Sequence, residues 1–407
     1  MPLARKRPEK NAVELMSQWT ELGTHEREPT NIRPVYAPKD FLEVIVSIHN
    51  QSSANKNMSG QLAMWGIIQT ALKVKDLQQL RSFYSELSMN HCQIGIDDTI
   101  DSLHDFFFAD HIRFGKKVIA ERLAPVSQEY SKRGCPISLR ATLWCQMLGI
   151  NLDNMDYLYY EQLKNYVLKH ELLTDKLFLK DIKLTATNDD QYFIFEDFLY
   201  QILLPFSRDT TLLQCLNQAG GRPLKSYIRG KLGNEDYAVA FPPSGVIPFH
   251  GFSMYVVPLC YLYSEPVKLY YVFRKMYTRF FFRLHIISSH EEGIVSLCLL
   301  FENLLQSLEP ELFFHLKRHG IQPLRIAFKW LIRAFSGFLA SDQVLLLWDR
   351  ILAFNSLQIL SILAAAVFSF RKSNLFKVQN FAAAESVFAD LMTLQVIPLI
   401  QLVLFSK

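Results

Sequence analysis

Apolar residues recur along most of this 407-residue chain at the spacing of an α-helix. Between residues 97 and 123 they stand three, four or seven positions apart, at Ile100, Leu103, Phe107, Phe114 and Val118. Residues 342–352 repeat the pattern, and Ser341 before them is a predicted N-cap; the positions are Val344, Leu347, Trp348, Ile351 and Leu352. Residues three and four apart share one face of a helix, so both stretches predict amphipathic helices and an all-α fold.

A shorter helix is predicted to begin at Pro136 and to end at Gly149. Proline suits the first helical turn, where its missing N–H costs little, and glycine is a common residue after the last turn. Leu139, Leu143 and Met147 form one stripe, while Arg140 and Trp144 lie four residues apart on the adjoining face. Further helices are predicted at 58–73, 156–170, 172–184 and 191–206.

Changes in composition divide the chain into four parts. Residues 1–38 are polar and read as a loosely ordered tail, residues 39–125 as a helical segment, residues 130–375 as the main domain, and residues 376–407 as apolar helices packed on it. The turn-forming residues 124–136 predict a linker at the main boundary. Residues 207–250 are rich in Gly, Pro and charge, which predicts a long surface loop with one short helix.

One uncharged stretch, residues 351–370, is long enough to cross a membrane. It also holds five polar residues, and the sequence Phe354-Asn355-Ser356 can break a helix. We therefore predict one or two buried helices and no transmembrane span. A membrane-embedded protein is the alternative.

Composition narrows the class of protein. The formal net charge is +4, which is too small for a nucleic-acid binder. Six scattered cysteines without a CxxC pair predict free thiols in a reducing compartment. No apolar segment follows the basic N-terminus, so no secretory signal is predicted and a cytoplasmic location is expected.

Motifs for independent chemistry are missing from the sequence. It has no GxxxxGK[ST] loop, no GxGxxG and no HExxH. His315 and His319 have the spacing of two metal ligands on one helix, but no third ligand stands nearby, so no metal site is expected.

The helix that begins at Pro136 resembles the first motif of the TBC domain, R-G-x-P-x-x-L-R-x-x-x-W. That helical domain belongs to GTPase-activating proteins of Rab-type small GTPases. The matching residues are Arg133, Gly134, Pro136, Leu139, Arg140 and Trp144. The resemblance covers about residues 130–375 and implies a TBC-type helical domain, preceded here by the additional N-terminal segment.

Later motifs follow in the expected order. The family's I-x-x-D-x-x-R-T is similar to residues 178–185, where Asp181 and Thr185 match but Leu184 stands at the arginine position. Its Y-x-Q-G-M, with a later Pro-Leu, is similar to 248–259, where Gly251 and Pro258 match but His250 replaces the glutamine. Near the end, Trp330, Phe335, Trp348 and Asp349 match the W…F…WD helices.

The resemblance implies a Rab-type partner that carries its own GTP and Mg²⁺, so this chain needs no cofactor. It also implies a role in vesicle trafficking and recruitment to endomembranes through the partner. Family members donate an arginine and a glutamine to the GTPase, and both are substituted here. The remaining candidates are Lys183 and His250, with Arg222 or Arg229 of the 207–250 loop as a further alternative. A Rab-binding scaffold or competitor without activity is the rival interpretation.

The retained motif residues have structural interpretations as well. We expect Arg140 and Trp144 to brace the first helix against its neighbours, with the arginine stacked on the indole ring or hydrogen-bonded near it. Asp181 is expected to orient neighbouring groups, and Trp348 and Asp349 to combine core packing with a helix contact. His250 is equally well explained as a turn residue before Gly251.

Overall fold

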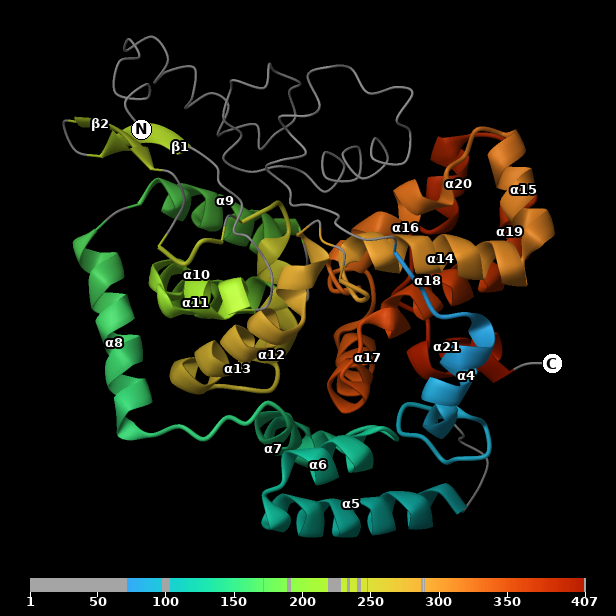
Figure 1. Cartoon of the computed structure of the whole chain (residues 1–407), viewed down its shortest axis with the longest axis horizontal. Helices are drawn as coiled ribbons and strands as arrows, with labels where there is room; N and C mark the ends of the chain where they lie inside the picture. Colours follow the sequence, from blue (N-terminus) through green and yellow to red (C-terminus); the bar gives the residue numbers. More distant parts are fainter. Residues whose placement is uncertain are drawn as a thin grey trace. The chain divides into compact units, whose positions relative to one another are not determined.

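The computed structural model describes residues 72–96, 103–170, 172–188, 192–218, 228–232, 235–239, 243–246, 248–286, 288 and 290–405 (Figure 1). The predicted tail at 1–38 and nearly all of the predicted helix at 58–73 lie outside these residues. Helices dominate the described part, which confirms the all-α fold class. One antiparallel hairpin, β1 (Ile228–Leu232) and β2 (Glu235–Val239), is the exception within it.

The described residues form two compact units. The first holds residues 152–288, and the second joins residues 72–151 to residues 290–405. The second unit therefore combines the end of the predicted N-terminal segment with the first motif and the C-terminal third of the chain. These limits differ from the domain limits expected from composition.

The first unit is organised around α10, which packs against both α8 and α9 (Figure 1). Leu199, Ile202, Leu203 and Phe206 of α10 are fully buried and have the i, i+3, i+4, i+7 spacing of one helix face. The helices of this unit are α8 (Asn154–Lys169), α9 (Leu173–Asn188), α10 (Glu196–Arg208), α11 (Thr211–Gln218), α12 (Val257–Cys260) and α13 (Pro266–Arg279), with 3₁₀ turns η4 (Phe193–Phe195), η5 (Phe252–Tyr255) and η6 (Phe281–Leu284).

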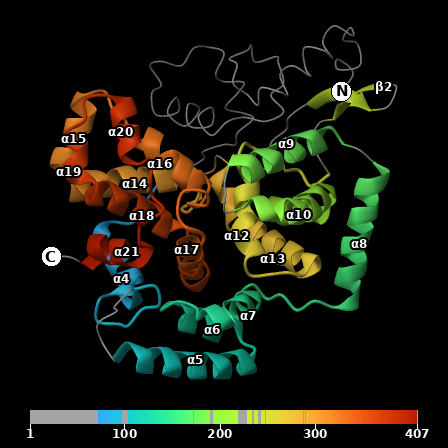
Figure 2. The ribbon, with the colours of Figure 1, turned by 180° about the vertical axis from the view of Figure 1, so that it is seen from behind.

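The second unit is centred on α18, which packs against α14 and α21 (Figure 2). Its helices before the first unit are α4 (Leu77–Phe83), η3 (Ser85–Leu87), α5 (Leu103–Glu121), α6 (Ala124–Ser131) and α7 (Ile137–Met147). Those after it are α14 (Ile294–Leu308), α15 (Pro310–Arg318), α16 (Pro323–Ile332), α17 (Ser341–Phe354), α18 (Gln358–Phe370), α19 (Lys372–Leu375), α20 (Phe381–Val387) and α21 (Val396–Phe405).

The uncharged stretch at 351–370 is two helices. Asn355, at φ 50°, ends α17 in the left-handed conformation, and α18 begins at Gln358. Residues 359–368 are fully buried within the unit. Among the residues that the structure describes, none of the helices combines the length and the apolar character that a membrane crossing requires. The prediction of buried helices is confirmed.

Several local predictions are wrong. Residues 124–131 form α6 instead of a linker, because Pro125 falls in the first turn, where proline is tolerated. The 207–250 stretch holds the predicted short helix, α11, but also the β1–β2 hairpin. Ala340, not Ser341, is the N-cap of α17, and it makes no side-chain cap.

The apolar stripe on α5 is also displaced from the one predicted. Phe114 is 57% exposed, whereas Val118 is buried. The packed face passes through Gly115, where an added Cβ would lie 2.4 Å from Tyr130 Oη and 2.7 Å from Leu139 Cδ1. An added methyl group would require the Tyr130 and Leu139 side chains to move, and a hydrophobic pattern does not register glycine.

Candidate functional site

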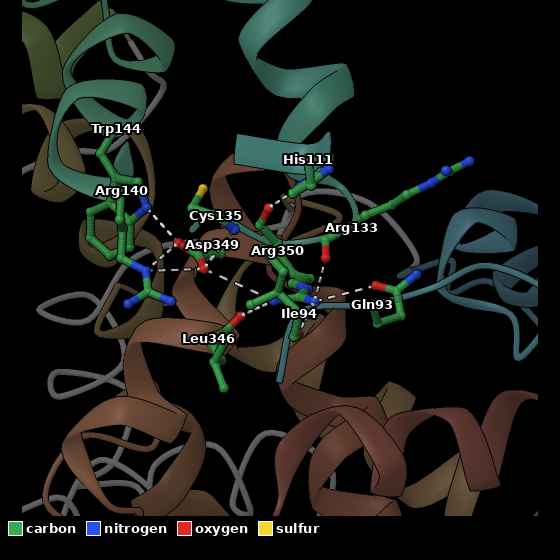
Figure 3. A network of polar contacts seen from close by, with 11 residues as sticks. Gln93, Ile94, His111, Arg133, Cys135, Arg140, Trp144, Leu346, Asp349 and Arg350 are labelled. Atoms are coloured by element: carbon green, nitrogen blue, oxygen red, sulfur yellow. Dashed lines mark hydrogen bonds and ion pairs between the residues drawn. The ribbon is translucent and has the colours of Figure 1, made fainter. Parts of the chain in front are cut away.

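The first motif is fastened to α17 by one buried carboxylate (Figure 3). Asp349 is fully buried, and its Oδ1 accepts from Trp144 Nε1 at 2.7 Å and from Arg140 Nε at 3.1 Å. Its Oδ2 accepts from the backbone N–H of Cys135 at 3.2 Å. Arg140 and Trp144 thus brace α7 by sharing Asp349, rather than by stacking on each other.

Arg350, the next residue on α17, makes a second set of buried contacts (Figure 3). It donates to one side-chain amide and three backbone carbonyls: Gln93 Oε1 at 3.2 Å, Ile94 O at 2.8 Å, Arg133 O at 3.1 Å and Leu346 O at 3.3 Å. Burial lowers the pKa of Arg350 to about 10, although Asp349 Oδ2 lies 4.0 Å away and opposes that shift. The sequence analysis did not identify Arg350 as a functional or structural residue. Its position next to the motif residue Asp349 was the only indication in the sequence.

Gly134 explains the glycine of the first motif. Its φ is 103°, and an added Cβ would lie 2.8 Å from both Arg350 Nη1 and Ile94 Cβ. Its carbonyl oxygen lies 3.2 Å from His111 Nε2. Beside it, Arg133 pairs with Glu86 at 3.2 Å, and Pro136 is the N-cap of α7. Glycine is therefore required both by conformation and by space.

One buried carboxylate, that of Asp349, faces the guanidinium groups of both Arg140 and Arg350. Burial opposes ionisation of Arg140, but the charge and hydrogen bond of Asp349 outweigh it and raise the pKa of Arg140 above its ordinary value. Burial, reinforced by the Asp349 charge, raises the pKa of the Cys135 thiol well above its ordinary value. Two guanidinium cations thus surround one carboxylate next to a neutral thiol, an arrangement suited to holding segments together.

A second buried carboxylate, Asp181 of α9, organises the loop that begins the 248–259 stretch, which resembles the family's third motif, Y-x-Q-G-M. Its Oδ1 accepts from Gly251 N at 2.5 Å, and its Oδ2 accepts from the backbone N–H and the hydroxyl of Ser253, both at 2.8 Å. Thr185 Oγ1, one turn further along α9, lies 2.6 Å from Ser253 Oγ. Gly251 has φ 95°, so glycine suits this turn. Pro258 follows in α12, where it is buried.

The two substituted positions lie beside Asp181. His250 Nδ1 is 3.8 Å from Asp181 Oδ1, and the histidine side chain is 39% exposed. Leu184 is half-buried on α9, one turn beyond Asp181, and Lys183 is exposed. Because one residue of helix is about 100° of rotation, Lys183 points away from the Leu184 direction. Arg222 lies outside the described residues, and Arg229 is in β1, paired with Ala238.

Other buried ion pairs hold α9 and its neighbours in place. Arg208 Nη1 and Nη2 both donate to the carboxylate of Asp175 in the first turn of α9, and Nη2 also donates to His170 O at 2.6 Å. Asp209 accepts from Arg274 Nε at 2.7 Å and from three hydroxyl groups, those of Tyr159, Tyr270 and Thr211. The sequence analysis identified neither of these ion pairs. Asp209 lies two residues before α11, so its position alone indicates only a helix cap.

The two histidines with the spacing of metal ligands make local contacts. His315 Nε2 lies 3.2 Å from Val378 O, and His319 Nδ1 lies 2.9 Å from His315 O, so both rings contact backbone oxygens. In the described part of the chain, no three His, Cys, Asp or Glu side chains are grouped so that they could hold a metal ion. All six cysteines are free, as predicted.

The chain is similar to solved structures and to known protein sequences. Two solved structures are similar over most of the chain, both at 13% identity. A Chlamydomonas flagellar RabGAP TBC domain has a TM-score of 0.48 and covers 84% of this chain and 100% of that one. The Ypt/Rab-GAP domain of Gyp1p has a TM-score of 0.44 and covers 81% and 97%.

The sequence matches show the family. Residues 248–376 match the model of the Rab-GTPase-TBC domain, so the first two motifs lie outside the matched range. The human protein TBC1 domain family member 19 is 57% identical over 406 residues, which is 100% of this chain and 77% of that protein. The resemblance seen in the motifs is confirmed: the chain belongs to the TBC domain family.

Proposed function

We propose that this chain binds a GTP-loaded Rab-type small GTPase and stimulates GTP hydrolysis only weakly. Membership of the TBC domain family supports the partner class. The observation that carries the second half is Leu184, which stands at the arginine position of α9 beside the Asp181-held loop. Recruitment to endomembranes and a part in vesicle trafficking would follow from the partner.

The chemistry explains why that one position matters. The reaction takes place on GTP and Mg²⁺ carried by the GTPase, and an activating protein contributes groups that stabilise charge on the transferred phosphoryl group. An arginine in this role accelerates hydrolysis by roughly 10³–10⁵. At about 1.4 kcal/mol per factor of ten, that corresponds to about 4–7 kcal/mol of barrier. Leucine has no donor with which to supply any of it.

His250 and Lys183 are the groups that remain. An imidazole can accept a hydrogen bond from water or donate one to an oxygen, so His250 can take over part of the glutamine's role. Asp181 and Thr185 would act by positioning the loop that carries it. Lys183 brings a compact charge rather than a planar pair of donors, and its direction on α9 differs from that of Leu184.

A scaffold or competitor is the second candidate, and the same residue favours it. If the chain binds the GTP-loaded partner without accelerating hydrolysis, it would shield that partner from active relatives. Leu184 accounts for this function without help from His250 or Lys183.

Single-turnover GTP hydrolysis across a panel of Rab GTPases tests both candidates. We expect little acceleration from the native chain, a further loss in His250→Ala, and a gain of at least 10²-fold in Leu184→Arg. His250→Gln should raise the rate of Leu184→Arg further, because it restores the second donor. Lys183→Ala tests the other remaining candidate. Its control is Lys176→Ala on the same helix, which should leave the rate of hydrolysis unchanged.

Binding must be measured separately from hydrolysis. Preference for the GTP-loaded over the GDP-loaded partner, with no acceleration, would support the scaffold. Strong acceleration that survives both His250→Ala and Lys183→Ala would contradict the site assignment. Absence of binding to every Rab tested would contradict both functions.

A further inference from the structure

One end of the second unit exposes aromatic and basic side chains together. Phe314, Lys317 and Arg318 lie on α15, and Phe376 and Lys377 directly follow α19; we call these five residues the α15–α19 surface. Phe314 is 53% exposed and Phe376 is 37% exposed. The three basic residues are exposed as well. None of the five belongs to the motifs described above.

The contacts of His315 join α15 and the residues after α19 into one surface. Its ring centroid lies 5.3 Å from that of Phe376, and its Nε2 lies 3.2 Å from Val378 O. On the exposed side of α15, Phe314, Lys317 and Arg318 have the i, i+3, i+4 spacing that places side chains on one helix face. Both ribbon views show α15 and α19 adjacent (Figures 1 and 2).

The charge of this end is positive. Residues 309–319 and 370–378 contain five lysines and arginines but only two acids, Glu309 and Glu311. Glu309 is engaged locally, since its carboxylate lies 2.5 Å from Lys372 Nζ and accepts from Ser369 Oγ at 2.6 Å. The positive charges of Lys317, Arg318 and Lys377 therefore exceed the single remaining charge of Glu311.

We propose that the α15–α19 surface binds an anionic lipid bilayer directly. Lysine and arginine near a membrane are attracted by anionic headgroups, and aromatic side chains between them enter the interfacial region. The pairing of exposed phenylalanine with lysine and arginine matches both properties of such an interface. A net charge of only +4 on the whole chain argues against nucleic acid. This inference is independent of the proposed Rab function.

Flotation of the full chain with vesicles, without any GTPase, tests it. We expect binding to phosphatidylcholine vesicles that contain 30% phosphatidylserine and little binding to pure phosphatidylcholine. Removing Lys317, Arg318 and Lys377 together by alanine substitution should weaken binding by about 100-fold, at about fivefold for each charge. Phe314→Ser with Phe376→Ser should weaken it even at low salt, where the charges act most strongly.

Matched controls separate binding by the α15–α19 surface from nonspecific binding to vesicles. Lys169→Ala with Lys275→Ala removes two exposed charges from α8 and α13, and Met155→Ser removes an exposed apolar side chain from α8. Both controls should bind like the native chain. Equal binding to both vesicle types, no binding to either, or equal loss in the controls would overturn the proposal. So would charge-dependent binding to polyglutamate without vesicle binding, which would assign the surface to an acidic protein.

Discussion

The two units each contain a buried aspartate that ties distant segments together, and the two differ in what surrounds them. Asp349 is surrounded by guanidinium groups, an indole N–H and a backbone N–H, and every motif residue around it is present. Asp181 binds two backbone N–H groups and a hydroxyl, and the two positions beside it, Leu184 and His250, depart from the family pattern. Under the proposed function, the chain has kept the residues that build the fold and changed those that would act on a partner.

The difference has an energetic side. Removing Asp349 leaves buried cations without their counter-charge, whereas removing Asp181 leaves neutral donors without an acceptor. Uncompensated buried charge is the more costly of the two. Stability should therefore depend more on the Asp349 centre, and function more on the Asp181 centre.

Asp349→Ala should have the largest effect. Arg140 and the indole N–H of Trp144 would lose their acceptor, and Arg350 would lose its nearest negative charge, for a loss of about 3–5 kcal/mol in the free energy of unfolding. Urea unfolding of the full chain measures it. Asp342→Asn, an exposed position on the same helix, should change the value little. Equal small effects in the two variants would show that the Asp349 centre is not holding α7.

Gly134→Ala should have the next largest effect, a loss of about 2–4 kcal/mol in the free energy of unfolding. An alanine at φ 103° is strained, and its Cβ would meet the Arg350 guanidinium at 2.8 Å. Gly149→Ala is the matched control, because Gly149 also has a positive φ but no atom lies within 4 Å of its added Cβ. We expect about 1 kcal/mol there. The difference between the two variants measures the steric conflict with Arg350 and Ile94 together with the greater backbone strain at φ 103°.

Asp181→Ala should cost less than Asp349→Ala, about 1–3 kcal/mol, since only neutral donors are left unsatisfied. Its distinguishing result is local: amide hydrogen exchange of Gly251 and Ser253 should accelerate, while exchange in α17 stays unchanged. A loss of stability as large as that of Asp349→Ala would remove the energetic distinction between the two centres.

The last prediction concerns the pH dependence of stability in the first unit. Burial lowers the pKa of His285 to about 3, and its Nε2 lies 2.8 Å from Tyr277 Oη. Below about pH 6.5 the unfolded chain binds a proton at His285, whereas the folded chain does not. The free energy of unfolding therefore decreases as the pH falls from 6.5 toward 3. The contribution is about 1.4 kcal/mol per pH unit. In His285→Gln, which keeps an acceptor, urea unfolding between pH 6 and 4 should show a correspondingly smaller slope.

Sequence analysis predicted the helical class, the break at Asn355 and the main motifs, because apolar periodicity and motif spacing are local properties. It missed Arg350 and Asp209, since the partners of a buried charge come from residues far apart in the chain. Arg350, for example, binds Ile94 O across 256 positions. The linker predicted at 124–136 failed for a local reason, because proline both breaks and begins helices.

The contacts of Arg350 also bear on where this chain can be cut. A fragment that begins near residue 130 would retain every recognisable motif but would lack Gln93 and the carbonyl oxygen of Ile94. The guanidinium group would then lose two of its four acceptors. Boundaries drawn from motifs alone would thus separate the domain from part of its own interior.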